Sequence, residues 1–453
     1  MKVPLSRFRL GVAVAVAGAV AVLSVFAERR LLAHRLSHGA RAHVHRLQMI
    51  AIFNVVIYLP SKFVWTRCVT EPTAACSRGK CDSWAGLWAV CVATFLLLVH
   101  TSLFTALFLV HIEPHVFSLV SSTCLGAYVL LNFWLLVLLP ADRCLRFAVR
   151  ALTPAMEKDE EVKDEKIERR KRARVLLAIA LLLTVSMTLL AVHNAAGRPH
   201  TPRVEVRLQR LPANLSGLKV ALLSDIHLGP TVGRSKLAQV VDITNGLRPV
   251  TGADLVVIVG DLADSLVSNL KDAAQPLSWL NPRLGTYFVT GNHEYYTHDV
   301  QAWFQYLRSL NVHPLHNQHV HLGGGPGERL CLAGVDDIEA LRIGYPGHGM
   351  NLGQALAGCE EGSAIILLAH QPRAAQAALE QRPDIDLVLA GHTHGGQFFP
   401  VSLAVYLYNP FFAGLYRHGE HSQVYVSQGS VFYGMPMRLG STAEVSEIVL
   451  LSR

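Results

Sequence analysis

Long uncharged stretches dominate the first part of the chain. Apolar residues fill positions 84–110 and 116–139, and the short loop 111–115 joins the two runs. About 20 apolar residues suffice for a helix to cross the hydrocarbon core of a bilayer. The pattern therefore predicts a membrane-spanning helical hairpin, and residues 175–192 predict a further span.

Two other runs are weaker candidates for spans. Residues 10–27 form an uncharged run of 18 residues with basic residues on both sides. The core of a signal peptide is only about 7–15 residues long, so we expect a span, although the small residues at its end also fit a cleavage site. Residues 47–65 contain Pro60 and Lys62 and cross only if the helix continues past both. We therefore expect a membrane region over 1–193 with four or five transmembrane helices.

The second half of the chain has a different pattern, in which short apolar runs alternate with amphipathic stretches. Residues 218–225 and 255–259 are predicted buried strands with the turns that end them, and residues 235–247 between them have helical spacing. A strand, helix, strand unit places its two strands in parallel, with their carboxyl ends at one edge of the sheet. We expect an α/β domain over 213–453, joined to the membrane region by a proline-containing linker at 194–212.

The distribution of charge predicts which side of the membrane each segment occupies. The chain is 51% hydrophobic and 16% charged, with a formal net charge of +8. Residues 141–174 carry eleven Lys or Arg residues, so the positive-inside rule places this loop in the cytoplasm. The domain after the last span is then luminal or extracellular, which fits the glycosylation sequon at Asn214. Five arginines between residues 28 and 46 oppose this arrangement if all five runs cross the bilayer.

The eight cysteines are divided between the two halves. Six belong to the membrane region, and Cys68, Cys76 and Cys81 share one short polar loop. One disulfide with a thiol left over and three free thiols both fit this loop. Cys331 and Cys359 are alone in the second half, so we expect the α/β domain to fold without a disulfide framework.

Residues of the types that bind metals follow five predicted strands, each at the point where the strand ends. Taken singly, each motif has an ordinary explanation, such as a turn or a helix cap. Chance does not readily place five of them in succession at the same kind of position, so together they indicate a metal site. The motifs are Asp225-Ile226-His227, Gly260-Asp261, Gly291-Asn292-His293-Glu294, His370 and Gly391-His392-Thr393-His394.

These residue types suit a centre of two divalent cations. Such ions, about 3.5–4 Å apart, need a shared anionic ligand and several neutral donors around them. Aspartate can bridge, imidazole suits Mn, Fe or Zn, and an asparagine oxygen adds a ligand without adding charge. Because the site has few carboxylates it stays electropositive, which favours a phosphate ester as substrate.

The order of the motifs resembles the calcineurin-like metallophosphoesterase family, whose pattern is Asp-x-His, Gly-Asp, Gly-Asn-His-Glu/Asp, His and Gly-His-x-His. The resemblance covers residues 215–452, and every position of the pattern is filled. It implies an α/β sandwich of two packed mixed sheets flanked by helices, with two metal ions. One ion would be held by Asp225, His227, Asp261 and His394, and the other by Asp261, Asn292, His370 and His392, with Asp261 as the bridging ligand.

The resemblance also implies a reaction. A metal-bridging hydroxide attacks phosphorus in line without a covalent enzyme intermediate, while His293 protonates the leaving-group oxygen or stabilises the transition state. Glu294 is expected to orient this part of the site. The predicted function is a membrane-anchored hydrolase of phosphate mono- or diesters.

The membrane anchor and the aromatic stretch 406–412 favour a phospholipid or glycolipid as the carrier of the ester, although core packing explains the aromatic stretch equally well. The alternative function is a metal-dependent binding module or receptor with little turnover. The basic loop at 141–174 does not indicate a nucleic-acid partner, because its interleaved Glu and Asp are typical of a solvated juxtamembrane helix.

Overall fold

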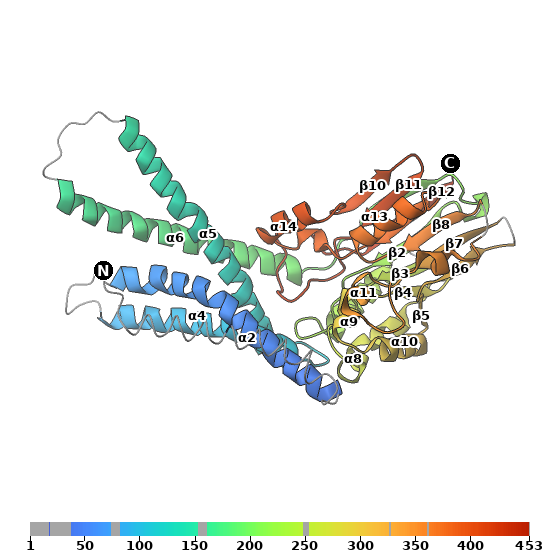
Figure 1. Cartoon of the computed structure of the whole chain (residues 1–453), viewed down its shortest axis with the longest axis horizontal. Helices are drawn as coiled ribbons and strands as arrows, with labels where there is room; N and C mark the ends of the chain where they lie inside the picture. The colour runs from blue at the N-terminus through green and yellow to red at the C-terminus, as the bar shows by residue number, and fades with distance from the viewer. Residues whose placement is uncertain are drawn as a thin grey trace. The chain divides into compact units, whose positions relative to one another are not determined.

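The structure, a computed structural model, describes residue 18 and residues 38–73, 82–152, 161–247, 253–325, 328–359 and 362–452. The chain divides into two compact units (Figure 1). The first unit comprises Met1–Phe108 and Val120–Ser186, and the second comprises Leu109–Leu119 and Met187–Arg453.

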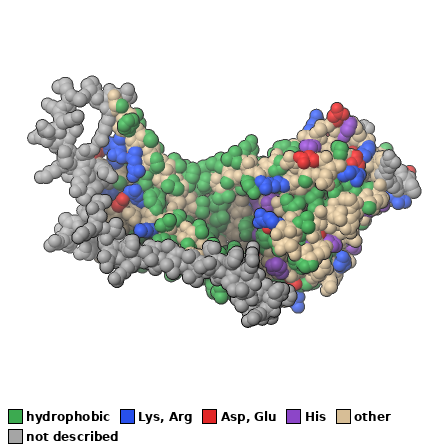
Figure 2. All heavy atoms as spheres, in the orientation of Figure 1, with side chains coloured by type: hydrophobic (Ala, Val, Ile, Leu, Met, Phe, Trp, Pro, Cys, Tyr) green, Lys and Arg blue, Asp and Glu red, His purple; other side chains and the backbone are tan. Residues whose placement is uncertain are grey.

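Long helices make up the first unit and continue briefly into the second. They are α2 (His38–Trp65), which continues as the π-helix η2 (Thr66–Thr70) and the short α3 (Glu71–Thr73), then α4 (Asp82–Phe108), α5 (Val116–Leu152) and α6 (Glu161–Ala196). Hydrophobic side chains cover much of the visible surface of these helices (Figure 2). Leu136 and Leu182, for example, are 62% and 67% exposed, as expected for helices that face lipid.

Four helices of the described residues are long and apolar enough to cross a membrane: Arg46–Thr70, Ser83–Phe108, Val116–Ala148 and Lys171–Ala196. They overlap the runs predicted at 47–65, 84–110, 116–139 and 175–192. The first of them is long enough because the helix runs through Pro60 without ending, which membrane helices tolerate when neighbours satisfy the freed backbone groups. Apart from residue 18, the predicted span at 10–27 lies outside the described residues.

The second unit contains two six-stranded mixed sheets packed face to face between layers of helices (Figure 1), as the sequence predicts. Parallel strands form the centre of each sheet. The first sheet has the order β1 (Arg203–Leu208), β12 (Ser446–Ser452), β2 (Leu218–Leu223), β3 (Leu255–Val259), β4 (Thr286–Val289) and β5 (Val312–Pro314). The second has the order β10 (Gly414–His418), β11 (Ser422–Val426), β9 (Leu387–Ala390), β8 (Ala364–Leu368), β7 (Arg329–Gly334) and β6 (Gln318–Gly323).

The helices of this unit are short and lie mostly between strands. Those that follow the central strands carry one apolar face. They are α7 (Arg234–Asn245), α8 (Val267–Ala274), α9 (Asn292–Tyr296), α10 (Val300–Ser309), α11 (Glu339–Ile343), α12 (Leu352–Leu356), α13 (Pro372–Gln381) and α14 (Val401–Tyr408), with 3-10 turns η3 (Ala213–Leu215), η4 (Gln275–Trp279) and η5 (His394–Gly396).

Three buried apolar layers hold the sheets and helices together. Side chains alternate between the two faces of a strand, so Leu222 of β2 packs between the sheets while Leu223 packs against the outer helices α7, α8 and α10. On the second sheet, Leu367 of β8 packs in the same way against α12 and α13. Because the central strands are covered on both faces, their sequences are continuous apolar runs.

The stretch expected to be a linker, 194–212, is largely part of the folded domain. Residues 203–208 form β1, which pairs in parallel with β12 at the edge of the first sheet. Val206 and Leu208 are buried. The alternation of Val204, Val206 and Leu208 with charged residues produces this half-buried strand, and the polar positions and prolines around it had made the stretch resemble a tether.

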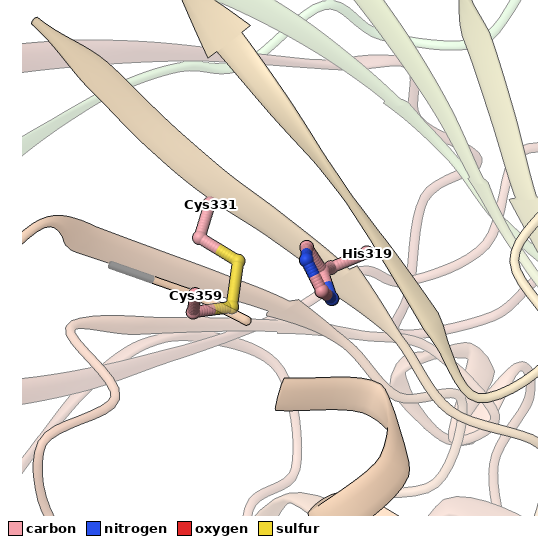
Figure 3. Close-up of side chains that lie close together, drawn as sticks. All are labelled: His319, Cys331 and Cys359. Atoms are coloured by element: carbon pink, nitrogen blue, oxygen red, sulfur yellow. A yellow bond between two sulfur atoms is a disulfide. The ribbon is translucent and has the colours of Figure 1, made fainter. Parts of the chain in front are cut away.

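A disulfide corrects the expectation for the cysteines of the second unit. Cys331 of β7 and Cys359, just after α12, are joined, and His319 of β6 lies beside them (Figure 3). The two cysteines are 28 positions apart in sequence, and α12 packs back against β6 and β7 and brings them together. In the first unit Cys68 is a buried free thiol, and Cys76 and Cys81 lie outside the described residues.

Candidate metal centre

The loops after five strands bring all the predicted site residues to one edge of the domain. Asp225 and His227 follow β2, Asp261 follows β3, and Asn292 and His293 open α9 after β4. The second sheet supplies the rest: His370 follows β8, and His392 and His394 follow β9. Backbone bonds tie these loops together, with the Asp225 N–H donating to the Gly260 carbonyl at 3.1 Å and the Gly391 N–H donating to the His370 carbonyl at 2.9 Å.

Five of the predicted ligands adopt a left-handed backbone conformation. Their φ angles are 53° for Asp225, 53° for His227, 52° for Asp261, 71° for His392 and 52° for His394. Residues with a Cβ rarely occupy this region, and such strain costs about 1–3 kcal/mol per residue. Strained backbone that clusters in this way is characteristic of sites in which side-chain direction matters more than local stability.

The first group of donors comprises Asp225, His227 and His394, all buried. The Nε2 atoms of His227 and His394 lie 3.1 Å apart, and His394 Nε2 lies 3.3 Å from Asp225 Oδ1. A carboxylate and two imidazoles at this spacing fit the shell of one cation.

The second group comprises Asp261, His370 and His392, with Asn292 beside them in the predicted set. The His370 Nδ1–H donates to the Val259 carbonyl at 2.8 Å, which leaves its Nε2 to face Asp261 Oδ2 at 3.1 Å. Asn292 Oδ1 and His392 Nδ1 are buried and have no hydrogen-bond partner within the described parts of the chain. Buried polar atoms are nearly always satisfied, so these unpaired atoms fit the ligands of a cation.

Asp261 lies between the two groups. Its Oδ2 atom is 3.7 Å from His227 Nε2 in the first group and 3.1 Å from His370 Nε2 in the second. This is the placement that a bridging ligand requires.

Asp264 belongs to the same centre and was missed in the sequence analysis. Its Oδ1 atom accepts a hydrogen bond from His227 Nδ1 at 2.9 Å and lies 2.8 Å from His293 Nδ1. Both imidazoles therefore turn their Nε2 atoms away from Asp264, and His293 Nε2 lies 4.0 Å from Asp261 Oδ2. The sequence feature that could have identified Asp264 is its position, three residues after Asp261 on the same strand-end loop.

Glu294 fastens the loops that follow β3 and β4. Its carboxylate accepts backbone N–H groups of Gly291 at 2.6 Å, Leu262 at 2.8 Å and Asp261 at 3.0 Å. The orienting role expected of Glu294 thus has a structural basis, since one side chain sets the spacing between Asp261 and the start of α9.

Burial and neighbouring charges set the protonation of the histidines. Burial, assisted by the charge of His370, lowers the pKa of His392 to about 4, so this imidazole is neutral near pH 7 and has lone pairs for a cation. Burial likewise lowers the pKa of His394. Burial also acts to lower the pKa of His293, but the carboxylates of Asp261 and Asp264 outweigh it and raise that pKa to about 9. Asp261 also raises the pKa of His370 against the effect of burial, but the Nε2 atom of His370 is a predicted metal ligand. His293, which is not a predicted ligand, is therefore the histidine suited to donate a proton.

An apolar cavity of about 430 Å³ opens beside the loop that carries His392 and His394. Its other walls come from α14 and from the segment that contains Tyr433 and Met435. The ring of Tyr433 packs against His227 and His293, at centroid distances of 4.6 and 4.7 Å. The cavity is therefore continuous with the candidate metal centre.

Comparison with known proteins agrees with this fold and site. The family model described as calcineurin-like phosphoesterase matches residues 218–396, a range that begins at β2 and ends just after the His392-Thr393-His394 loop. The chain belongs to the calcineurin-like phosphoesterase family and is a metal-dependent phosphoesterase.

Its full-length relatives also share the membrane region. The chain is 45% identical over 439 residues to a protein of Danio rerio named "Transmembrane protein with metallophosphoesterase domain", with 96% of this chain and 97% of that protein covered. It is 45% identical over 450 residues to the Bos taurus protein of the same name, covering 98% of each. An "Uncharacterized metallophosphoesterase" of Helicobacter pylori is 35% identical over 261 residues, which cover 58% of this chain and 66% of that protein.

Proposed function

We propose that this membrane-associated phosphoesterase hydrolyses phosphate mono- or diesters at a centre of two divalent cations. One observation carries the proposal: two donor groups meet on either side of Asp261, with unpaired buried ligand atoms in the second. Asp225, His227, Asp261 and His394 would hold one cation, and Asp261, Asn292, His370 and His392 the other. Bound Mn, Fe or Zn cations would neutralise the phosphate and make hydroxide available near neutral pH.

His293 is the proposed general acid. Asp264 Oδ1 lies 2.8 Å from His293 Nδ1. The Nε2 atom of His293 therefore faces the centre and can donate a proton to the leaving-group oxygen. For in-line attack, the leaving group must lie on the His293 side of phosphorus, opposite the nucleophile. Tyr433 covers the rings of His227 and His293 and limits the access of water to them.

We further propose that the α/β domain is luminal or extracellular. The basic loop at 141–174 supports a cytoplasmic location for the segment before α6. The Cys331–Cys359 disulfide is typical of an oxidising compartment. Asn214 is exposed in η3, where a glycan can be attached.

A hydrolysis assay tests the proposed function. The purified full-length chain, stripped of metal and then supplied with Mn²⁺ or Zn²⁺, should hydrolyse a chromogenic aryl phosphodiester. Asp261→Asn should lower the rate at least 100-fold, because it removes the anionic charge shared by both cations. If wild type and Asp261→Asn are equally slow in every metal, the chain acts as a binding module or receptor and not as a hydrolase.

A further inference from the structure

Helix α14 presents an apolar surface to its surroundings. Of its eight residues, all of them described, none is buried, and Leu403, Tyr406 and Leu407 are 56%, 63% and 84% exposed. Between residues 197 and 400, the described large apolar side chains that are exposed, such as Trp279 and Leu341, are well separated in sequence. A gathered apolar patch of this kind normally contacts another apolar phase or partner.

The inner side of α14 forms one wall of the apolar cavity at the candidate metal centre. Val401, Val405 and Tyr408 line it from α14, and His392 and His394 line it from the opposite side. A volume of about 430 Å³ admits part of a hydrocarbon chain together with its linkage. A ligand seated there would contact both α14 and the loop that carries His392 and His394.

Hydrogen bonds connect this cavity to the end of a candidate membrane span. Near the end of α6, whose residues from Met187 onward belong to the second unit, the Ala191 carbonyl accepts a hydrogen bond from the Arg438 backbone N–H at 2.8 Å. Asn194 Nδ2 donates to the Arg438 carbonyl at 3.1 Å. The candidate span ends at Ala196, so the segment that carries Arg438 is bonded to the last residues of this candidate span.

The same segment forms the wall of the cavity and the base of α14. Tyr433 and Met435 line the cavity, and the Phe399 N–H donates to the Leu439 carbonyl at 3.0 Å, two residues before α14 begins. Backbone hydrogen bonds thus connect the end of α6 to the cavity wall, and the cavity wall to the start of α14. Within the second unit, these contacts connect α14 to the carboxyl-terminal end of α6.

The side chains of α14 suit that layer. Tyrosines such as Tyr406 and Tyr408 are enriched where a membrane meets water. The exposed Arg373 donates to the Tyr408 hydroxyl at 3.2 Å, and its guanidinium lies 3.8 Å from the centre of the Tyr408 ring. Arg373 therefore lies beside a residue that lines the cavity, and an exposed cation at this position can contact a lipid phosphate.

We propose that α14 lies in the interfacial layer of the bilayer that anchors this chain, and that the cavity takes the lipid part of a membrane phospholipid as substrate. The proposal rests on the proposed function, because the metal centre would act on the lipid's phosphodiester. Hydrolysis consumes one water: its oxygen bonds to phosphorus, the ester P–O bond breaks, and the leaving alcohol oxygen takes a proton.

Photo-crosslinking identifies what covers α14. Full-length protein with Leu407→p-benzoylphenylalanine is reconstituted in vesicles of phosphatidylcholine, phosphatidylethanolamine, phosphatidylserine and phosphatidylinositol, irradiated and analysed by mass spectrometry. We expect phospholipid adducts at position 407, at least tenfold more abundant than with the matched control Leu341→p-benzoylphenylalanine, whose parent side chain is 65% exposed. Equal adducts at both positions, or crosslinks from 407 to a second copy or to another protein, would overturn the placement of α14.

Lipid turnover tests the substrate class in the same vesicles. Leu403→Ser/Leu407→Ser should lower the ratio of phospholipid hydrolysis to aryl phosphodiester hydrolysis at least tenfold, whereas Leu341→Ser should leave this ratio unchanged. Hydrolysis of the aryl ester without hydrolysis of any phospholipid would overturn the lipid proposal and leave the proposed function intact. Failure to hydrolyse either substrate would instead contradict the proposed function, and the crosslinks at 407 would still report on the placement of α14.

Discussion

Asp264 is the residue whose role depends most on contacts that the sequence does not display. Its Oδ1 atom lies 2.9 Å from His227 Nδ1 and 2.8 Å from His293 Nδ1. These contacts set the direction in which both imidazoles point. Partners of this kind typically change activity or metal affinity by about 10–100-fold when they are mutated.

Asp264→Asn should therefore lower kcat for an aryl phosphodiester by about 10–100-fold. Asp272, an exposed aspartate on α8, serves as the control when changed to Asn and should retain kcat within about twofold. The carboxylate of Asp264 contributes to the raised pKa of His293, so its removal lowers that pKa. Because a general acid must be protonated, the alkaline limb of the pH–rate profile should move to lower pH. A profile and kcat equal to those of wild type would rule out this role.

His293 should matter most for substrates with poor leaving groups. An alkyl ester needs a proton on its leaving oxygen, so His293→Gln should slow its hydrolysis by about 10²–10⁴-fold. A nitrophenyl ester leaves readily as an anion and should be slowed much less. Kinetics on a series of esters measures the difference, with the exposed His313→Gln as control, and a loss that does not depend on the leaving group would contradict general-acid catalysis.

At the scale of elements, the turn after β3 leaves little room for side chains. Gly260 has a φ of +77°, and an added Cβ would lie 2.6 Å from both the Gly291 backbone nitrogen and His370 Nδ1. The loops after β3, β4 and β8 therefore meet closely at this glycine, which lies next to Asp261.

Gly260→Ala should disturb Asp261 and His370 together and weaken metal binding at least tenfold, with a backbone strain of about 1–3 kcal/mol. Isothermal titration with Mn²⁺ measures the change in affinity. Gly325→Ala is the matched control, because an added Cβ there meets nothing within 4 Å. Unchanged affinity in Gly260→Ala would mean that the loops can separate without cost.

The sequence predicted the strands and the groups at their ends well, and predicted contacts between distant side chains poorly. Apolar runs that stop at Asp, Asn or His located the loops after β2, β3, β4, β8 and β9, because parallel strands share one edge. Asp264 was missed because a carboxylate that bonds two histidines does not differ in sequence from any other loop aspartate. The β1 strand and the Cys331–Cys359 disulfide were missed because both depend on partners far along the chain.

At the scale of the whole molecule, the proposed topology makes a prediction about modification. Protein isolated from cells should lose mass on treatment with N-glycosidase, and Asn214→Gln should remove that change. Asn214 is exposed and lies in a short 3-10 turn at the edge of the domain. A loss of mass that persists in Asn214→Gln would assign the glycan to another site.

The disulfide gives an independent test of the same topology. Without reductant, wild type and Cys331→Ser/Cys359→Ser should react with equal amounts of a maleimide polymer after denaturation. After reduction, wild type should take up two more equivalents, because its bonded thiols are then released. Two extra equivalents on unreduced wild-type protein would mean that the thiols are free in cells, and would contradict an oxidising location.

The number of cations bound tests the account most directly. Asp225 is one of the proposed ligands of the first cation, and asparagine tolerates its left-handed backbone, so Asp225→Asn should keep the fold. Elemental analysis by mass spectrometry of metal-saturated, desalted full-length protein should give two equivalents of Mn or Zn per wild-type chain and about one per Asp225→Asn chain. A dinuclear centre built on these residues would be contradicted if wild type hydrolyses a phosphoester with one equivalent of metal or none. It would also be contradicted if both proteins bind two equivalents.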